Sequence, residues 1–250
     1  MRVGLGLLSL ACLGVGACTS DSPKDQDPRT ATELYVMKGV QYMEKGRLDI
    51  AQQDLERAVE LDDGNAEAHN ALGVLYERLN RTEDSEAQYK LALALDDQHY
   101  AAETNYGRLL CAQGKYDLAM KHFQKVIDAK SYQTPWLVLT NAGICAKSKG
   151  SAAEAEGYLR KALSLLPDFP PALLEMAKLS FEQGSYLSAR AFLQRYESTV
   201  PPTPESLFVG VQNEQALGNS KNADAYRKKL QKLFPDSKEA MRSRKSHASQ

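Results

Sequence analysis

The chain has 250 residues, of which 31 are lysine or arginine and 32 are aspartate or glutamate, so its formal net charge at pH 7 is −1. A net charge this close to zero gives the protein no extended positive surface potential, which argues against nucleic acid as a partner. We therefore expect no nucleic-acid binding. The length fits either one large domain or an array of smaller units.

The chain begins with a segment that is typical of an export signal. Arg2 precedes an almost unbroken apolar run from Val3 to Val15, and small residues follow it. This run is shorter than the roughly 20 residues that a membrane-spanning helix needs, so residues 1–17 are predicted to be a cleaved signal peptide. The residues up to Cys18 resemble the bacterial lipobox, which predicts a covalent lipid on Cys18 and no other cofactor. The alternative is an ordinary signal peptide that contains a cysteine by chance.

Two flanking segments lack the apolar side chains that a folded core requires. Residues 18–31 contain no large apolar residue apart from the cysteine, so we expect a lipidated flexible tether there. Residues 239–250 are polar and basic without periodicity, and we expect them to be disordered. The folded domain is accordingly predicted to span residues 32–238.

Between these segments the sequence repeats a pattern of small and turn residues, as at Gly39, Gly46 and Ala51. The pattern recurs at intervals of 34, 34, 36, 34 and 34 residues, and 34 residues is the period of the tetratricopeptide helix pair. The first small residue of each unit, or its replacement, is Gly39, Gly73, Gly107, Gly143, Ala177 and Val211. We predict an all-α fold: a right-handed superhelical solenoid of six tetratricopeptide repeats.

The sixth unit departs from the pattern in two places. Val211 stands where a small residue is expected, and Arg227 stands where the other units have a large apolar residue. A terminal unit of a solenoid presents its outer face to water. We therefore expect Arg227 to lie on that outer face.

Two cysteines lie within the repeats, Cys111 in the first helix of the third unit and Cys145 in the first helix of the fourth. These helices are expected to stack side by side. An exported chain meets an oxidising compartment, where two free thiols tend to pair. We predict a disulfide between Cys111 and Cys145, with two buried reduced thiols as the alternative.

No sequence pattern typical of catalysis or metal binding is present. The histidines have no metal-ligand spacing to another His, Cys, Asp or Glu. HExxH, GxSxG, GxGxxG and the phosphate-binding glycine loop are all absent from the sequence. We therefore expect neither an enzyme nor a metal site.

A solenoid of helix pairs offers instead a concave groove, lined by the first helix of each pair. In the usual register Val36, Val40 and Met43 form an apolar stripe in the first unit. An exposed apolar strip with a charged rim is a candidate docking site for a partner's helix or strand. The predicted partner-binding residues are Val36, Val40, Met43, Asn70, Val74, Arg78 and Arg108. The alternative is that the tether covers the stripe or that the stripe packs internally.

The chain resembles the PilF/PilW family of type IV pilus biogenesis and stability lipoproteins, also called pilotins. The similarity covers the lipobox and nearly all of the repeats, and it is most specific in residues 105–123, 132–150, 170–196 and 204–218. Cys111 and Cys145 fall where several members have paired cysteines, which supports the predicted disulfide.

The resemblance implies a protein–protein scaffold that is lipid-anchored in the outer membrane of a Gram-negative bacterium and faces the periplasm. It implies that the partner is the pilus secretin, whose localisation and multimerisation the scaffold promotes for twitching motility. Thr19 and Ser20 lack the aspartate that commonly retains a lipoprotein in the inner membrane, so outer-membrane sorting is expected. We expect a monomer. The alternative is a repeat lipoprotein that serves outer-membrane protein assembly or murein synthesis.

Overall fold

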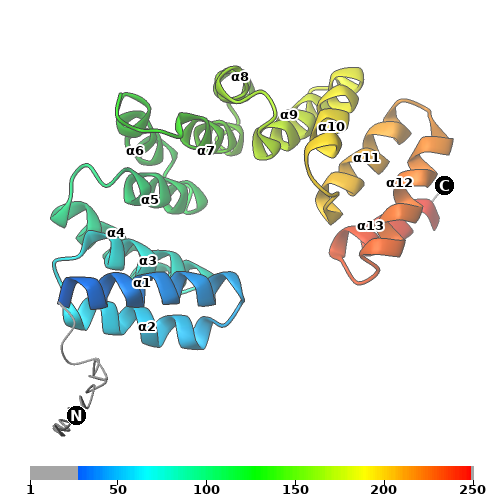
Figure 1. Ribbon diagram of the computed structural model, residues 1–250. Helices are drawn as coiled ribbons and strands as arrows, with labels where there is room; N and C mark the ends of the chain where they lie inside the picture. The colour runs from blue at the N-terminus through cyan, green and yellow to red at the C-terminus, as the bar shows by residue number, and fades with distance from the viewer. Residues whose placement is uncertain (1–27, 249–250) are drawn as a thin grey trace, which may run out of the picture.

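Thirteen α-helices and no strand make up residues 28–248, the part of the chain that the computed structural model describes. Consecutive helices pair through short turns, and the pairs stack into an open arc with α1 at one end and α13 at the other (Figure 1). The helices are α1 (Pro28–Glu44), α2 (Leu48–Leu61), α3 (Ala66–Arg78), α4 (Thr82–Leu95), α5 (Tyr100–Ala112), α6 (Tyr116–Ile127), α7 (Pro135–Ser148), α8 (Ala152–Leu165), α9 (Pro170–Glu182), α10 (Tyr186–Thr199), α11 (Pro204–Ala216), α12 (Ser220–Leu233) and α13 (Lys238–Ala248). The predicted all-α solenoid of helix pairs is confirmed.

Each pair turns sharply because one residue between its two helices has a positive φ. Asn80 has a φ of 57° between α3 and α4, and Gly114 has a φ of 75° between α5 and α6. Glycine adopts this left-handed backbone without steric cost, and asparagine tolerates it better than most residues do. Both residues occupy the turn position that the repeat pattern predicts.

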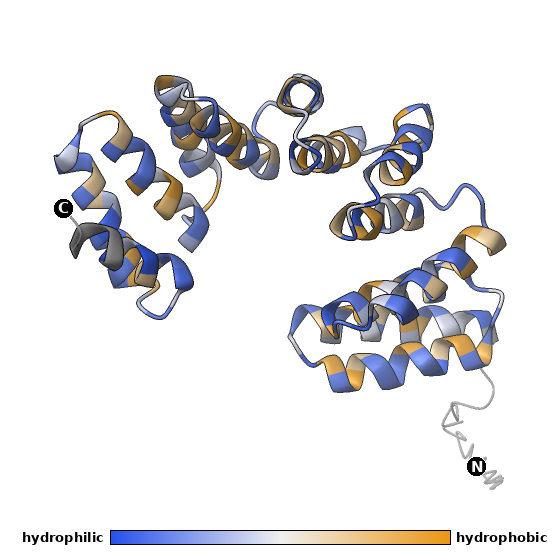
Figure 2. Ribbon diagram, turned by 180° about the vertical axis from the view of Figure 1, so that it is seen from behind, coloured by the Kyte–Doolittle hydropathy of each residue, from blue (hydrophilic) through white to orange (hydrophobic). Residues whose placement is uncertain are grey.

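Glycines in the first helices let the second helices approach closely. A Cβ atom on Gly107 would lie 2.6 Å from Cε1 of Phe123, and one on Gly73 would lie 2.5 Å from Cε1 of Tyr89. Both aromatic side chains are fully buried at these contacts. The buried residues form successive clusters along the arc, as expected for a repeat fold, and hydrophobic positions follow its whole length in Figure 2.

In the last pair, α11 and α12, the close contact lies one residue earlier than predicted. Gly210 faces the aromatic ring, since a Cβ atom there would lie 2.6 Å from Cδ1 of Tyr226. Val211 is instead fully buried. The expectation that Arg227 meets water is wrong, because this residue is only 6% exposed. The reason is that α13 packs against both α11 and α12, so this pair is not the outer face of the solenoid.

The prediction of a disordered tail at residues 239–250 is also wrong for its described part, because residues 238–248 form α13. Ser237 caps this helix by accepting a hydrogen bond from the backbone N–H of Ala240 at 3.1 Å. Ala240 and Ser243 are fully buried on a helix that packs against α11. Because the buried positions hold small side chains, the segment lacks the periodic large apolar residues that predict an amphipathic helix from sequence.

The N-terminal boundary of the folded domain lies earlier than predicted. Helix α1 begins at Pro28 and not at residue 32, and Thr32 is already fully buried. Proline is favoured at the first position of a helix because its missing N–H has no partner there in any case. The rest of the predicted tether and the signal peptide, including Cys18, lie outside the described residues.

A carboxylate on α4 ties the second helix pair to the third. Glu86 accepts hydrogen bonds from Tyr106 of α5 at 3.3 Å and from Gln113 at 3.1 Å. It also lies 2.7 Å from Nζ of Lys90 on its own helix. The hydrogen bond from Lys90, followed by that from Gln113, lowers the pKa of Glu86 to about 2. The ionised carboxylate is therefore the form that joins the two pairs.

Replacing Glu86 by glutamine is expected to lower the free energy of unfolding by about 2 kcal/mol at neutral pH, because a charged acceptor forms stronger hydrogen bonds than an amide does. The pKa of Glu86 is lowered from 4.5 to about 2, so the stabilisation is present above pH 4.5 and is lost as the pH falls toward 2. Urea denaturation across this range measures it. Glu83→Gln, an exposed position on the same helix, is the control. A Glu86→Gln effect independent of pH would contradict the assignment.

Candidate binding surface along the first helices

The first helix of each pair lies beside the first helix of the next pair, and polar side chains join most of these neighbours. Arg78 of α3 donates to the backbone carbonyl of Met43 in α1 at 2.6 Å. The amide of Asn105 in α5 donates to Asn70 of α3 at 3.0 Å. We call such side-chain contacts between neighbouring first helices the polar links. They hold together the surface formed by α1, α3, α5, α7, α9 and α11.

A two-pronged polar link connects α5 to α3. The guanidinium of Arg108 donates to both carboxylate oxygens of Glu77, at 2.9 and 3.0 Å. The hydroxyl of Tyr89 donates to the same carboxylate at 2.5 Å. Burial, together with the charge of Glu77, raises the pKa of Tyr89, so this hydroxyl remains a donor. Glu77 is therefore held in one position by two partners from different helices.

Polar links of alternating charge connect α7, α9 and α11. Lys147 of α7 lies 3.0 Å from Glu175 and 3.5 Å from Glu182, both on α9. Lys178 lies 2.6 Å from Glu175 and 2.8 Å from Glu205 of α11. Burial disfavours the charge of Lys178, but hydrogen bonds to these two carboxylates outweigh it and raise the pKa of Lys178. Charges on this part of the surface are thus largely paired within the protein.

The predicted apolar stripe is not an open docking strip. Val36 is 7% exposed and Met43 is 4% exposed, and both belong to the core between α1, α2 and α3. Val40 and Val74 are half-buried and pack against the same core. The prediction is wrong for this stripe because α3 packs against α1 and α2 and covers it. Internal packing is the alternative that the sequence left open.

The three polar residues predicted to bind a partner are engaged within the protein. Asn70 is 5% exposed and accepts the hydrogen bond from its neighbouring first helix. Arg78 and Arg108 are exposed, but each guanidinium is bound to the preceding first helix. Their polar groups therefore join neighbouring first helices within the protein.

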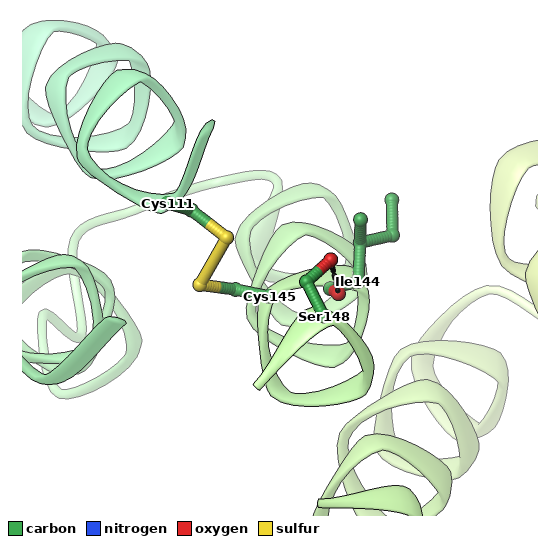
Figure 3. The surroundings of a disulfide bond; sticks show 4 residues. All are labelled: Cys111, Ile144, Cys145 and Ser148. Carbon is green, nitrogen blue, oxygen red and sulfur yellow. Dashed lines mark hydrogen bonds between the residues drawn. A yellow bond between two sulfur atoms is a disulfide. The ribbon is translucent and has the colours of Figure 1, made fainter. Parts of the chain in front are cut away.

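A disulfide joins α5 to α7, and it links the two cysteines that the sequence analysis paired. The Cα atoms of Cys111 and Cys145 are 5.7 Å apart. Cys145 is buried, and Cys111 is partly exposed. Figure 3 shows the bond passing from one helix to the other, with Ile144 and Ser148 next to it on α7. The bridge crosses the connection whose repeat interval is 36 residues instead of 34.

A pocket of about 270 Å³ lies beside the disulfide. We call it the α5–α7 pocket, and it is lined by Arg108, Cys111, Ala112, Phe123, Asn141, Ile144 and Ser148. Arg108 was predicted to lie on the partner-binding surface, but no pocket was predicted beside it. A pocket depends on which neighbouring side chains leave a gap, and repeat spacing carries no information on that gap.

A second pocket, of about 330 Å³, lies among residues of α9, α11 and α13. Phe181 and Phe208 line it from α9 and α11, and Arg242 lines it from α13. This pocket was not predicted from the sequence, because the residues of α13 were expected to be disordered. One signal was available: Ser237 lies 34 residues after Thr203, which caps α11 in the same way.

Among residues 28–248, no group of three or more His, Cys, Asp or Glu side chains is placed to hold a metal ion. None of the helices in that range combines the length and the apolar character needed to cross a membrane. What the surface does present are apolar pockets, amides and guanidinium groups. Such groups bind peptide side chains, backbone and carboxylates.

Comparison with known proteins agrees with this architecture. Models of the tetratricopeptide repeat match residues 36–100, 78–134 and 146–205. The type IV pilus assembly protein PilF of Pseudomonas aeruginosa is 27% identical over 246 residues, covering 96% of this chain and 97% of PilF. The crystal structure of PilW, a widely conserved type IV pilus biogenesis factor, gives a TM-score of 0.76 at 28% identity over 84% of this chain and 96% of PilW. The structure of P. aeruginosa PilF gives 0.73 at 26% identity, over 88% of this chain and 100% of that one. The chain therefore belongs to the tetratricopeptide repeat family and, within it, is similar to the type IV pilus proteins PilF and PilW.

Proposed function

We propose that this protein is a lipid-anchored scaffold of the outer membrane that binds the type IV pilus secretin and promotes its localisation and multimerisation. The observation that carries the proposal is the match to PilF over nearly the whole of both chains, which includes the N-terminal segment as well as the repeats. A shared repeat alone would support only a shared fold, because one fold serves many functions.

The N-terminal sequence supports membrane anchoring. Cys18 ends a stretch that resembles a lipobox, and acylation there would attach the chain to the membrane. Each buried acyl CH₂ contributes about 0.8 kcal/mol, and one chain holds a protein only marginally whereas two or more hold it firmly. A secretin subunit bound to the anchored solenoid would then reach its site of assembly at high effective concentration. The lipid supplies the location and the repeats supply the binding.

Cys18→Ala is expected to give a folded protein that still binds secretin but no longer concentrates it at the outer membrane. In a deletion strain complemented with this variant, secretin multimers in outer-membrane fractions should fall at least several-fold, while co-purification of secretin with the variant persists. The measurement is immunoblotting of fractionated envelopes.

Cys12→Ala is the matched control, because Cys12 lies within the predicted signal peptide and would be removed with it. This variant should support wild-type levels of multimers. Normal multimers in the outer membrane of the Cys18→Ala strain would exclude lipid tethering as the mechanism. Absence of secretin from both purified proteins would exclude secretin as the partner.

A further inference from the structure

The series of polar links along the first helices is interrupted between α5 and α7. From α1 to α5, and again from α7 to α11, neighbouring first helices are joined by side-chain hydrogen bonds or ion pairs on the surface. Between residues 100–112 and 135–148, the described contacts contain the disulfide but no such link. Because no polar link spans this position, the surface is open here as the α5–α7 pocket.

The α5–α7 pocket is apolar on most of its lining. Ala112 of α5, the buried Phe123 of α6 and the half-buried Ile144 of α7 all line it. In Figure 3 Ile144 projects from α7 beside the disulfide, clear of the bond between the two sulfur atoms. The helical spacing 137, 141, 144 puts the exposed Leu137 on the same face of α7. Leu137 and Ile144 therefore lie on one face of α7, with Asn141 between them.

One amide in the pocket has no partner in the described part of the protein. Asn141 lines the pocket and is partly exposed, and no hydrogen bond is formed by its side chain. An asparagine amide carries both a donor and an acceptor, which is the pair of groups that an extended peptide backbone presents. The other polar wall residue, Ser148, donates its hydroxyl hydrogen to the backbone carbonyl of Ile144 at 3.1 Å.

Arg108 is the one charged residue among those that line the pocket, and its charge is paired with that of Glu77. The side chain of Arg108 is 47% exposed and lines the pocket while its Nη1 and Nη2 atoms bind Glu77. A guanidinium has five N–H donors, so Arg108 retains donors for a second carboxylate. No Asp or Glu is among the residues that line the pocket. A carboxylate next to an inserted apolar side chain can therefore accept hydrogen bonds from Arg108 without meeting a like charge among the lining residues.

We propose that the α5–α7 pocket receives one aliphatic side chain from an acidic, extended segment of a partner protein. Asn141 hydrogen-bonds the backbone of that segment, and Arg108 pairs with a neighbouring carboxylate. The inference rests on the proposed scaffold function, because it assigns the place where a partner docks. It does not depend on secretin being that partner.

The test is direct binding to the purified full chain in detergent. The probe is a fluorescein-labelled heptapeptide with leucine at its centre and glutamates on both sides, followed by fluorescence anisotropy. The comparison probes replace the central leucine by alanine or the glutamates by lysines. We expect the leucine–glutamate probe to bind at least about tenfold more tightly than either of them.

Ile144→Glu places a charge in the pocket and is expected to weaken binding of the leucine–glutamate probe at least tenfold. Leu187→Glu is the matched control, since Leu187 is 70% exposed on α10 and is not a pocket residue. It should change binding less than twofold. Ala112→Phe fills the pocket from an exposed position on α5 without adding charge, and it replaces Ile144→Glu if circular dichroism shows that the latter is unfolded.

The proposal is overturned if no probe binds, if the alanine-centred probe binds as tightly as the leucine-centred one, or if the folded pocket variants bind normally. It is also overturned if size-exclusion chromatography shows that Ile144 mediates a dimer of this chain that occludes the pocket. The assay contains no secretin, so its failure leaves the secretin proposal standing. Conversely, if the fractionation experiment excludes secretin as the partner, the result of the peptide-binding assay still holds.

Discussion

Phe123→Ala is expected to lower the free energy of unfolding by about 3 to 5 kcal/mol, the range for removing a buried aromatic ring. Phe123 is fully buried and fills the space that the absent side chain of Gly107 leaves on α5. The ring also belongs to the cluster that joins the third helix pair to the fourth, so its loss weakens a contact between repeats as well as one within a repeat. Urea denaturation followed by far-UV circular dichroism measures the change.

Gly107→Ala tests the same contact from the opposite helix. In the wild-type chain the new Cβ would meet the ring at 2.6 Å, and we expect a net loss of about 1 kcal/mol. In the Phe123→Ala chain the clash is gone, and the substitution should instead stabilise by about 0.5 to 1 kcal/mol because alanine favours a helix over glycine. Gly157→Ala, with no atom within 4 Å of its added Cβ, should stabilise in both chains. If Gly107→Ala has the same sign of effect on stability in the wild-type and Phe123→Ala chains, close packing against Phe123 is not the role of Gly107.

Reduction of the Cys111–Cys145 disulfide is expected to lower the free energy of unfolding by about 3 to 4 kcal/mol. The two cysteines are 34 residues apart, and a cross-link that closes a loop of this length removes that much chain entropy from the unfolded state. The two helices also share no polar link in the described contacts, so no hydrogen bond or ion pair between α5 and α7 compensates for loss of the bond. Urea denaturation with and without a phosphine reductant gives the difference.

The double variant Cys111→Ala/Cys145→Ala provides the control for reduction. Its stability should match that of the reduced wild-type chain to within about 1 kcal/mol, since only two sulfur atoms are removed. Addition of the reductant should leave the double variant unchanged. A reductant effect that persists in this variant would have to arise elsewhere, and equal stability of oxidised and reduced wild-type chain would contradict the prediction.

The candidate binding surface carries separate pockets instead of one continuous apolar groove. Ion pairs such as Lys147–Glu175 and Arg108–Glu77 close the surface at most steps between first helices. In the proposed mode of docking, this surface would select partners by the spacing of their apolar side chains. It would also select partners whose carboxylates can reach exposed arginine or lysine side chains.

Much of the fold could be predicted from the sequence because its signals are local or periodic. Gly114 and Asn80 mark turns through their own backbone preferences, and Gly107 pairs with Phe123 at a fixed offset within one repeat. The α13 helix was missed because its buried positions are Ala240 and Ser243, whose small side chains produce no hydrophobic periodicity. The helix is recognisable only from the neighbours against which it packs.

The sequence by itself determined the helix pairs, their turns, the pairing of Cys111 with Cys145 and the resemblance to PilF and PilW. Only the tertiary structure decided which side chains of the first helices remain open to a partner. Val36 and Met43 are covered by α3, and Asn70 is bound by Asn105. The physical reason is that exposure depends on how closely side chains from neighbouring repeats approach, and that distance is set by packing between the helix pairs. Repeat spacing fixes which helices are neighbours, whereas packing between them fixes where a pocket remains.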